Sequence, residues 1–317
     1  MYFLGIDGGG TKTEFLLVDE KGGLVSQKRS GTISYRQIGM TACIRLLKDI
    51  IHSMTEGLED EVGICLAFPN WGESRANDAF FTKHLDEISS HPIWVVNDSA
   101  AGWAGSLALS PGINLVAGTG SIAYGRKEDG KWARSGGWSD AFSDEGSCFW
   151  LGKKTLELFS KESDGRAEKG SLFTLIREYF LLESDMDLID IFENTLRNNR
   201  TKVADLQKIL LKAAMEGDEA AKNLYKEAAS ELALIVSAVY DKLEFEGTVP
   251  VSYSGGLFHA GDLILHPFQE KLAGKKIRLQ KPRFSPVQGA VLLAASHWGK
   301  TFSAAEDIIE NLAGQGE

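Results

Sequence analysis

Cysteine is scarce in this chain of 317 residues, and cationic side chains are outnumbered by anionic ones. The cysteines Cys43, Cys65 and Cys148 are far apart in sequence, which argues against a disulfide framework and against a zinc site of ordinary spacing. Isolated thiols are typical of a reducing cytoplasm. The 34 Lys and Arg residues against 44 Asp and Glu give a formal net charge of −10. An acidic chain repels phosphate backbones, so we expect no nucleic-acid partner.

Long apolar runs are also absent. No stretch reaches the roughly 18 residues of a membrane-spanning helix, and the N-terminus lacks the charged leader and apolar core of a signal peptide. We therefore expect a cytoplasmic protein with no membrane partner. The composition, 43% hydrophobic and 25% charged, is typical of a globular protein, and the length favours two domains.

The order of the expected elements repeats along the chain. Three short strands open the first half, and helices and strands then alternate, which favours a mixed α/β sheet. A Ser110-Pro111-Gly112 turn separates this part from a second strand–turn–strand–turn–strand unit and a long helical region. We expect an N-terminal domain at residues 1–109 and a C-terminal domain with a helical insertion at 110–300. Residues 301–317 are expected to pack back on the first domain. The strands expected in the two meanders are Tyr2–Ile6, Glu14–Asp19, Leu24–Arg29, Ile113–Ala117, Ser121–Arg126 and Lys131–Arg134.

A glycine-rich turn follows the first expected strand. Its residues are Gly8, Gly9, Gly10, Thr11, Lys12 and Thr13. Backbone amides in such a turn can hold phosphates, and Asp7 at the end of the strand could hold Mg²⁺ through its water shell. The spacing is neither a Walker A loop nor G-x-G-x-x-G. The alternative is a plain hairpin turn capped by Asp7.

A second glycine turn comprises Gly118, Thr119, Gly120 and Ser121. With Ala123 it fits G-x-G-x-x-A, a dinucleotide signal that must open a helix. Residues 122–126 instead continue as a strand, which favours a phosphate-binding hairpin over the loop of a NAD-dependent oxidoreductase. A third pair, Gly255 and Gly256, follows another strand and is either a turn or a nucleotide contact.

Two acidic positions could carry chemistry. Asp98 ends a buried strand, where a carboxylate can act as the general base for a hydroxyl or can cap the next helix. Asp144 and Glu145 follow Gly136-Gly137-Trp138 and could bind sugar hydroxyls or form an ordinary helix N-terminus.

These motifs together resemble the N-acetylglucosamine kinase and BadF/BadG/BcrA/BcrD ATPase family of the acetate kinase, sugar kinase, Hsp70 and actin superfamily. The resemblance rests on seven segments in order and covers almost the whole chain. It implies two ribonuclease-H-like domains with a nucleotide cleft between them. The segments are Gly5–Thr13, Asn97–Ala101, Gly118–Ser121, Gly136–Trp138, Asp144–Ser147, Ser254–Gly256 and Gln288–Ala290.

The resemblance implies an ATP- and Mg²⁺-dependent kinase that phosphorylates a hydroxyl of an amino sugar, most simply N-acetylglucosamine. Glucosamine, N-acetylmuramic acid or another hexose is the alternative acceptor. Asp98 matches the general base, the first two glycine turns match the phosphate motifs, and Gly255 and Gly256 match the adenosine motif. The matched sugar-contacting positions are Asp98, Thr119, Gly137 and Asp144.

The acceptor side departs from the family pattern in two loops. Ser34 stands where the amino-sugar kinases carry an Asn, and the loop at 68–72 reads Phe-Pro-Asn-Trp-Gly. A changed rim can alter which sugar fits. We expect Ser34, Tyr35, Asn70 and Trp71 to face the sugar, and the alternative for the two aromatic rings is ordinary packing.

The family also contains ATPases that activate a 2-hydroxyacyl-CoA dehydratase-type partner through a shared iron–sulfur cluster. That alternative needs thiolates brought together, and the three cysteines lie in expected core or helical elements. The resemblance is compatible with a homodimer.

Overall fold

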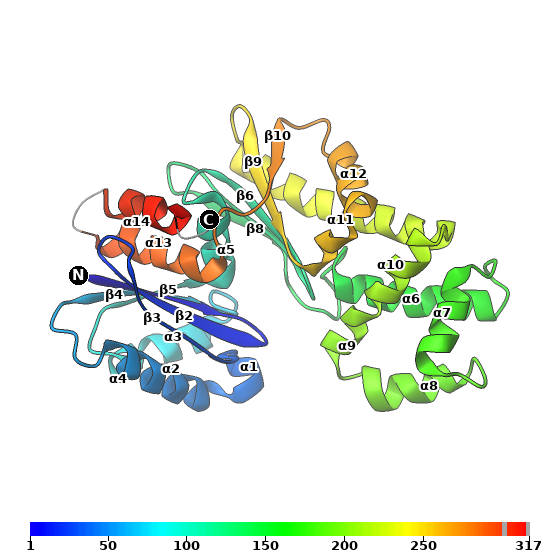
Figure 1. Cartoon of the computed structure of the whole chain (residues 1–317), viewed down its shortest axis with the longest axis horizontal. Helices are drawn as coiled ribbons and strands as arrows, with labels where there is room; N and C mark the ends of the chain where they lie inside the picture. The colour runs from blue at the N-terminus through cyan, green and yellow to red at the C-terminus, as the bar shows by residue number, and fades with distance from the viewer. Residues whose placement is uncertain (300–302, 315–317) are drawn as a thin grey trace. The chain divides into compact units, whose positions relative to one another are not determined.

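The computed structural model describes residues 1–299 and 303–314 and separates into two compact units (Figure 1). Unit 1 comprises Met1–Pro111 together with Lys281–Glu317, and unit 2 comprises Gly112–Gln280. Each unit contains one mixed five-stranded sheet, so the expected α/β class is confirmed.

The sheet of unit 1 has the strand order β3-β2-β1-β4-β5. The first three strands form an antiparallel meander, and β4 and β5 extend it in parallel with β1. The side chains of Leu4 and Ile6 alternate onto the face covered by α2, where Leu47 and Ile51 pack against them. The strands are β1 (Tyr2–Gly8), β2 (Lys12–Asp19), β3 (Leu24–Gly31), β4 (Val62–Phe68) and β5 (Ile93–Asn97).

Helices cover both faces of this sheet, with α2 on one face and α13 on the other (Figure 1). Two helices, α1 and α2, follow β3 in place of one continuous helix, because Gly39 takes a left-handed φ of 81° that ends the first. The helices of unit 1 are α1 (Tyr35–Ile38), α2 (Met40–Thr55), α3 (Arg75–Thr82), α4 (Leu85–Ile88), α5 (Asp98–Leu107), α13 (Pro286–Trp298) and α14 (Ser303–Gly314).

Helix α13 corrects the expected domain boundary, since residues 281–300 were assigned to the C-terminal domain. Gly289 lies so close to α5 that a Cβ atom there would stand 2.0 Å from the carbonyl oxygen of Ala101. A Cβ atom at Gly5 of β1 would likewise stand 2.5 Å from the amide nitrogen of Val291. These glycines let α13 pack directly on β1 and α5, and the chain therefore returns to unit 1.

The C-terminal segment continues from α13 into α14. Asn311 donates a side-chain hydrogen bond to the carbonyl of Lys21, in the turn between β2 and β3. Of the tail expected at 301–317, residues 301–302 and 315–317 lie outside the described residues, as does residue 300.

The sheet of unit 2 has the order β10-β9-β6-β7-β8, which repeats the pattern of unit 1. Strands β6, β7 and β8 form the meander, while β9 and β10 run parallel to β6. The strands are β6 (Gly112–Ala117), β7 (Ser121–Arg126), β8 (Trp132–Gly136), β9 (Val249–Ser254) and β10 (Ile277–Gln280).

A large helical segment stands between β8 and β9 of unit 2 (Figure 1). Its long helix α11 packs on β7 and β8. Val236 and Val239 of this helix belong to the hydrophobic core of unit 2. Among the described residues, no helix is long and apolar enough to cross a membrane. The helices of unit 2 are α6 (Cys148–Ser163), α7 (Ser171–Phe180), α8 (Asp187–Ile191), the π-helix η1 (Phe192–Leu196), α9 (Arg200–Asp205), α10 (Gln207–Met215), α11 (Glu219–Leu243), the 3₁₀ helix η2 (Gly256–Ala260) and α12 (Asp262–Lys271).

Candidate active site

The first glycine turn joins β1 to β2. The amide of Gly9 donates to the carbonyl of Lys12 at 2.9 Å, which closes the turn. Only glycine fits at position 8, because a Cβ atom would lie 2.6 Å from Ile33 and 2.8 Å from Pro69. The amides of Gly10 and Thr11 donate no hydrogen bond within the described residues. Such amides at an exposed turn can bind an anion.

Two carboxylates lie near this turn, at the ends of parallel strands. Asp7 is near the end of β1, and Asp98 begins α5 immediately after β5. Burial, reinforced by the negative charges of Asp98 and Glu14 and opposed by Lys12, raises the pKa of Asp7 to about 7. The carboxylates of Asp7 and Asp98 therefore repel one another within unit 1, and a cation at Asp7 would relieve that repulsion.

The start of α5 is capped by Asn97. Its side-chain oxygen accepts a hydrogen bond from the amide of Ser99, and its Nδ2 donates to the carbonyl of Trp71 at 2.9 Å. The alternative that Asp98 is the helix cap is therefore wrong. Asp98 is the first residue of the helix, where its Oδ1 also accepts from the amide of Ser99 at 2.9 Å.

The two loops expected to face the sugar are hydrogen-bonded to each other. The hydroxyl of Ser34 donates to Oδ1 of Asn70 at 3.2 Å, and Nδ2 of Asn70 donates to Glu73 at 3.1 Å. Glu73 also forms an ion pair with Arg36, with 3.0 Å between nitrogen and oxygen. Asn70 has a left-handed φ of 66°, a conformation that asparagine tolerates better than most residues. Glu73 and Arg36 could not be recognised from the sequence, because their pairing depends on contact between two loops.

The aromatic residues of these loops pack against the core of unit 1. Trp71 meets Phe68 and Phe81 edge to face, with centroid distances of 6.4 and 6.2 Å. The ring of Tyr35 lies 6.1 Å from that of Phe68, and its hydroxyl is buried with no partner among the described residues. Packing alone thus accounts for much of the position of each ring.

The second glycine turn joins β6 to β7 in unit 2. The amide of Gly118 donates to the carbonyl of Gly120, and the amide of Cys148, the first residue of α6, donates to the carbonyl of Gly118, each at 2.9 Å. Ser121 begins a strand rather than a helix. The predicted hairpin is confirmed, and the G-x-G-x-x-A spacing does not open a helix; phosphate binding by this turn stays a prediction.

Asp144 is a buried residue that contacts this second turn through a hydrogen bond. It is 4% exposed, its Oδ1 accepts from the amide of Ser121 at 3.2 Å, and it forms an ion pair with Arg200. Burial raises the pKa of Asp144 even though the Arg200 guanidinium acts in the opposite direction. Arg200 is a site residue that the sequence did not reveal, since it lies 56 positions away in the helical segment.

Glycines bring the third loop against the second. A Cβ atom at Gly255, which has a φ of 110°, would stand 2.3 Å from the carbonyl oxygen of Ala117, directly before the Gly118 turn. Gly137 also has a left-handed φ, 66°, and packs on Ile122 of β7. Unit 2 therefore collects Gly118–Ser121, Gly137, Asp144 and Gly255 around one end of its sheet.

The donor set near the first turn fits a hydrated divalent cation. Asp7 supplies a carboxylate whose negative charge is poorly compensated, since Lys12 is paired with Glu14 at 2.6 Å. In the described part of the chain, no group of three or more His, Cys, Asp or Glu side chains could cage a metal. Mg²⁺ is commonly held by one or two carboxylates together with water and substrate phosphates, which matches this arrangement.

The cysteines do not form a cluster site. Cys43 and Cys65 lie in α2 and β4 of unit 1, Cys148 lies in α6 of unit 2, and all three are buried and free. Burial raises the pKa of Cys43 to about 12 and that of Cys148 to about 11. Thiols held in the protonated form are poor ligands for an iron–sulfur cluster.

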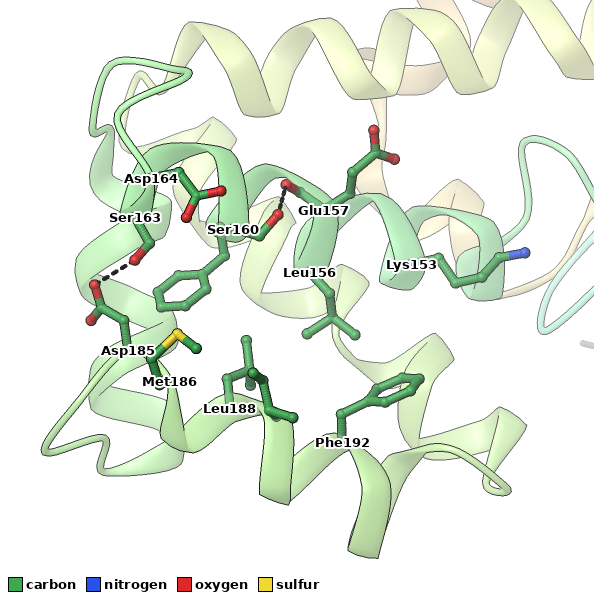
Figure 2. A pocket seen from close by; sticks show the side chains of 12 residues that line it. Lys153, Leu156, Glu157, Ser160, Ser163, Asp164, Asp185, Met186, Leu188 and Phe192 are labelled. Carbon is green, nitrogen blue, oxygen red and sulfur yellow. Dashed lines mark hydrogen bonds between the residues drawn. The ribbon is translucent and has the colours of Figure 1, made fainter.

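A cavity of about 530 Å³ lies in the helical segment of unit 2, between α6 and α8 (Figure 2). Leu156, Leu188 and Phe192 point into it from facing helices, and Ser163 donates to Asp185 at its edge. None of the motif residues lines this cavity. It is therefore separate from both glycine turns.

Comparison with known proteins assigns the chain to a family. The profile of the BadF/BadG/BcrA/BcrD ATPase family matches residues 4–294, nearly the whole chain. The chain belongs to this family. The resemblance drawn from the motifs is confirmed.

Individual relatives and one solved structure are similar over more than nine tenths of the chain. It is 30% identical to an N-acetylmuramic acid/N-acetylglucosamine kinase of Clostridium acetobutylicum, over 93% of this chain and 98% of that one. It is 29% identical to an N-acetyl-D-glucosamine kinase of Dictyostelium discoideum, over 92% and 97% of the two chains. A crystal structure assigned as an N-acetylglucosamine kinase of Chromobacterium violaceum shares the fold, with a TM-score of 0.71 at 23% identity over 92% and 98%.

Proposed function

We propose that this protein transfers the γ-phosphoryl group of ATP to a hydroxyl of an amino sugar, with N-acetylglucosamine as the first candidate acceptor. The similarity to two amino-sugar kinases extends over more than nine tenths of the chain and supports the enzyme class. The chain is an ATP-dependent sugar kinase. The structural observation that supports a working site is the pair of carboxylates, Asp7 and Asp98, beside the first glycine turn.

Each unit supplies residues for the nucleotide. In unit 1 the amides of Gly10 and Thr11, which have no partner in the described part of the chain, would bind phosphate oxygens together with the rest of the turn from Gly8 to Thr13. In unit 2 the turn from Gly118 to Ser121 would bind phosphates, and Gly255 and Gly256 would contact the adenosine. Bound Mg²⁺ supplies charge neutralisation for the phosphates, and Asp7 would hold it through water.

Asp98 is the proposed general base. It would accept the proton of the acceptor hydroxyl as that oxygen bonds to the γ-phosphorus, while the bond from the γ-phosphorus to the β-phosphate oxygen breaks and ADP leaves. Ser34 and Asn70 would bind sugar hydroxyls from unit 1, with Tyr35 and Trp71 as apolar walls. Thr119, Gly137 and Asp144 are the proposed sugar contacts of unit 2.

N-acetylglucosamine is the first of several candidate acceptors. The relatives act on N-acetylglucosamine and, in one case, also on N-acetylmuramic acid by name. Glucosamine and other hexoses stay as alternatives, because Ser34 and Asn70 alter the hydrogen-bonding groups of the acceptor loops.

The test is ADP release from MgATP across a panel of N-acetylglucosamine, glucosamine, N-acetylmuramic acid, N-acetylmannosamine and glucose. We expect one amino sugar to stimulate turnover strongly, and Asp98→Asn to lower kcat by about 10²- to 10⁴-fold. Near-normal ADP binding by the Asp98→Asn variant would locate the defect in the chemical step. ATP hydrolysis that no sugar stimulates would contradict the proposal.

A further inference from the structure

Residues 32–37, which we call the strap, connect the first glycine turn to the loop after β4. The strap follows the edge strand β3 and includes most of the short helix α1. Its side chains form hydrogen bonds in two directions within unit 1.

Two strap side chains hold the glycine turn. The hydroxyl of Thr32 donates to the carbonyl of Gly9 at 2.7 Å, and Nε2 of Gln37 donates to the carbonyl of Gly10 at 2.9 Å. Ile33 is fully buried and presses against Gly8. The strap therefore contacts three consecutive residues of the turn.

Holding a carbonyl also aims the next amide. In a planar trans peptide the C=O of one residue and the N–H of the next point in opposite directions. Thr32, by holding the carbonyl of Gly9, thus fixes the direction of the Gly10 amide, and Gln37 does the same for the amide of Thr11. Neither of these two amides has a hydrogen-bond partner among the described residues.

Two other strap side chains reach the loop after β4. Ser34 donates to Asn70 at 3.2 Å, and Arg36 pairs with Glu73 at 3.0 Å. Glu73 in turn accepts from Asn70 at 3.1 Å. A ligand that orders Asn70 would thereby order the strap, and the strap would order the turn.

We propose that Thr32 and Gln37 are positioning residues for the nucleotide phosphates, and that the strap couples acceptor binding to nucleotide binding. The inference rests on the proposed kinase function for the identity of the two ligands. A bound sugar raises the affinity of the turn for ADP or ATP, and by linkage the nucleotide raises the affinity for the sugar to the same extent.

The experiment compares Thr32→Val and Gln37→Met, singly and together, with two matched controls. Thr82→Val removes a hydroxyl that donates to the carbonyl of Asp78 in α3, away from the turn, and Gln27→Met changes an exposed glutamine of β3. Calorimetry gives the Kd of MgADP with and without the stimulating sugar, and steady-state kinetics gives kcat and both KM values.

We expect each strap variant to raise the Kd of MgADP and the KM of ATP by about three- to tenfold. Thr32→Val should have the larger effect because Gln37 is more exposed. The sugar-induced gain in ADP affinity should shrink in the double variant, while kcat and the controls stay near wild type.

Wild-type nucleotide affinity and an unchanged sugar-induced gain in the double variant would overturn the inference. An equal loss of ATP affinity, sugar affinity and kcat with a lowered Tm would also overturn it, since that pattern reports a purely structural role. A wild-type protein that binds MgADP but shows no sugar-stimulated turnover would instead contradict the proposed function and, because no sugar-induced gain could then exist, the coupling as well.

Discussion

The two units share one strand order, but different kinds of residue hold their glycine turns in place. In unit 1, Asp7 lies next to the end of β1, and the turn that follows is held by Thr32 and Gln37 of a neighbouring loop. In unit 2, β6 ends at Ala117, and its turn is held by the ion pair of Asp144 and Arg200. The hairpin of unit 1 thus has a poorly compensated carboxylate beside it, whereas the carboxylate beside the hairpin of unit 2 is paired with an arginine.

The difference separates two roles that a phosphoryl-transfer site needs. A poorly compensated carboxylate such as Asp7 favours a cation, whereas a neutralised turn such as Gly118–Ser121 offers amides without a repelling charge beside the phosphates. The helical segment between β8 and β9 supplies Arg200, and unit 1 has only α1 and α2 at the equivalent point, between β3 and β4. The two sheets therefore share a strand order, while the additional helices of unit 2 give its turn a different electrostatic environment.

We expect the largest effect from removing the charge of Asp7, because this charge distinguishes the turn of unit 1 from that of unit 2. We expect Asp7→Asn to lower kcat/KM for ATP by about 100-fold or more, because the variant loses the proposed anchor for Mg²⁺. The same variant should be more stable than wild type at pH 8 by on the order of 1–4 kcal/mol, a rise in Tm of at least about 2 °C.

The sign follows from the direction of the pKa shift. Because the pKa of Asp7 is raised to about 7, the folded protein loses stability as pH rises from about 4 to 7, and the full cost is present above that range. The variant lacks this cost, so the two Tm values should converge near pH 4. Thermal unfolding at both pH values, without nucleotide or Mg²⁺, measures the effect, and a variant less stable at pH 8 would contradict the assignment.

A matched pair of alanine substitutions should sharpen the contrast between the two turns. A Cβ atom at Gly120 would lie 2.6 Å from Arg200 and 2.9 Å from Asp144, whereas at Gly10 the nearest atom is Gln37 Nε2 at 3.6 Å. We expect Gly120→Ala to cost about 1–3 kcal/mol and Gly10→Ala to leave Tm near wild type while raising the KM of ATP. Equal Tm values for the two variants would show that the second turn is not packed as described.

The smallest effects should come from two hydroxyls. The hydroxyl of Tyr35 in unit 1 is buried without a partner among the described residues, and that of Ser121 in unit 2 donates to the carbonyl of Glu145 at 2.7 Å. We expect Tyr35→Phe to leave Tm and the KM of the sugar unchanged, and Ser121→Ala to lower stability by about 1 kcal/mol. A raised sugar KM in Tyr35→Phe would show that the hydroxyl, rather than the ring, meets the acceptor.

Much of the fold was predictable because its signals are local. Alternating apolar residues and glycine turns predicted both meanders, and the strand that follows Gly120 decided between a hairpin and a dinucleotide loop. The candidate site was predictable where one segment carries it, as in residues 7–13 and 118–121. Gly39 shows the limit of this approach: apolar periodicity continues across it, and only its backbone conformation ends the helix.

Long-range pairings were decided by the tertiary structure alone. Local periodicity predicts α13 as a helix, but its place in unit 1 depends on close contact between Gly289 and α5, nearly two hundred positions earlier in the chain. The ion pair of Asp144 with Arg200, the hold of Thr32 on Gly9 and the raised pKa of Asp7 likewise depend on which elements meet. By itself the sequence determined which segments form strands, helices and turns, because those preferences act over a few residues. Packing determined which charges are buried together, because burial and electrostatic interaction depend on distance in space rather than along the chain.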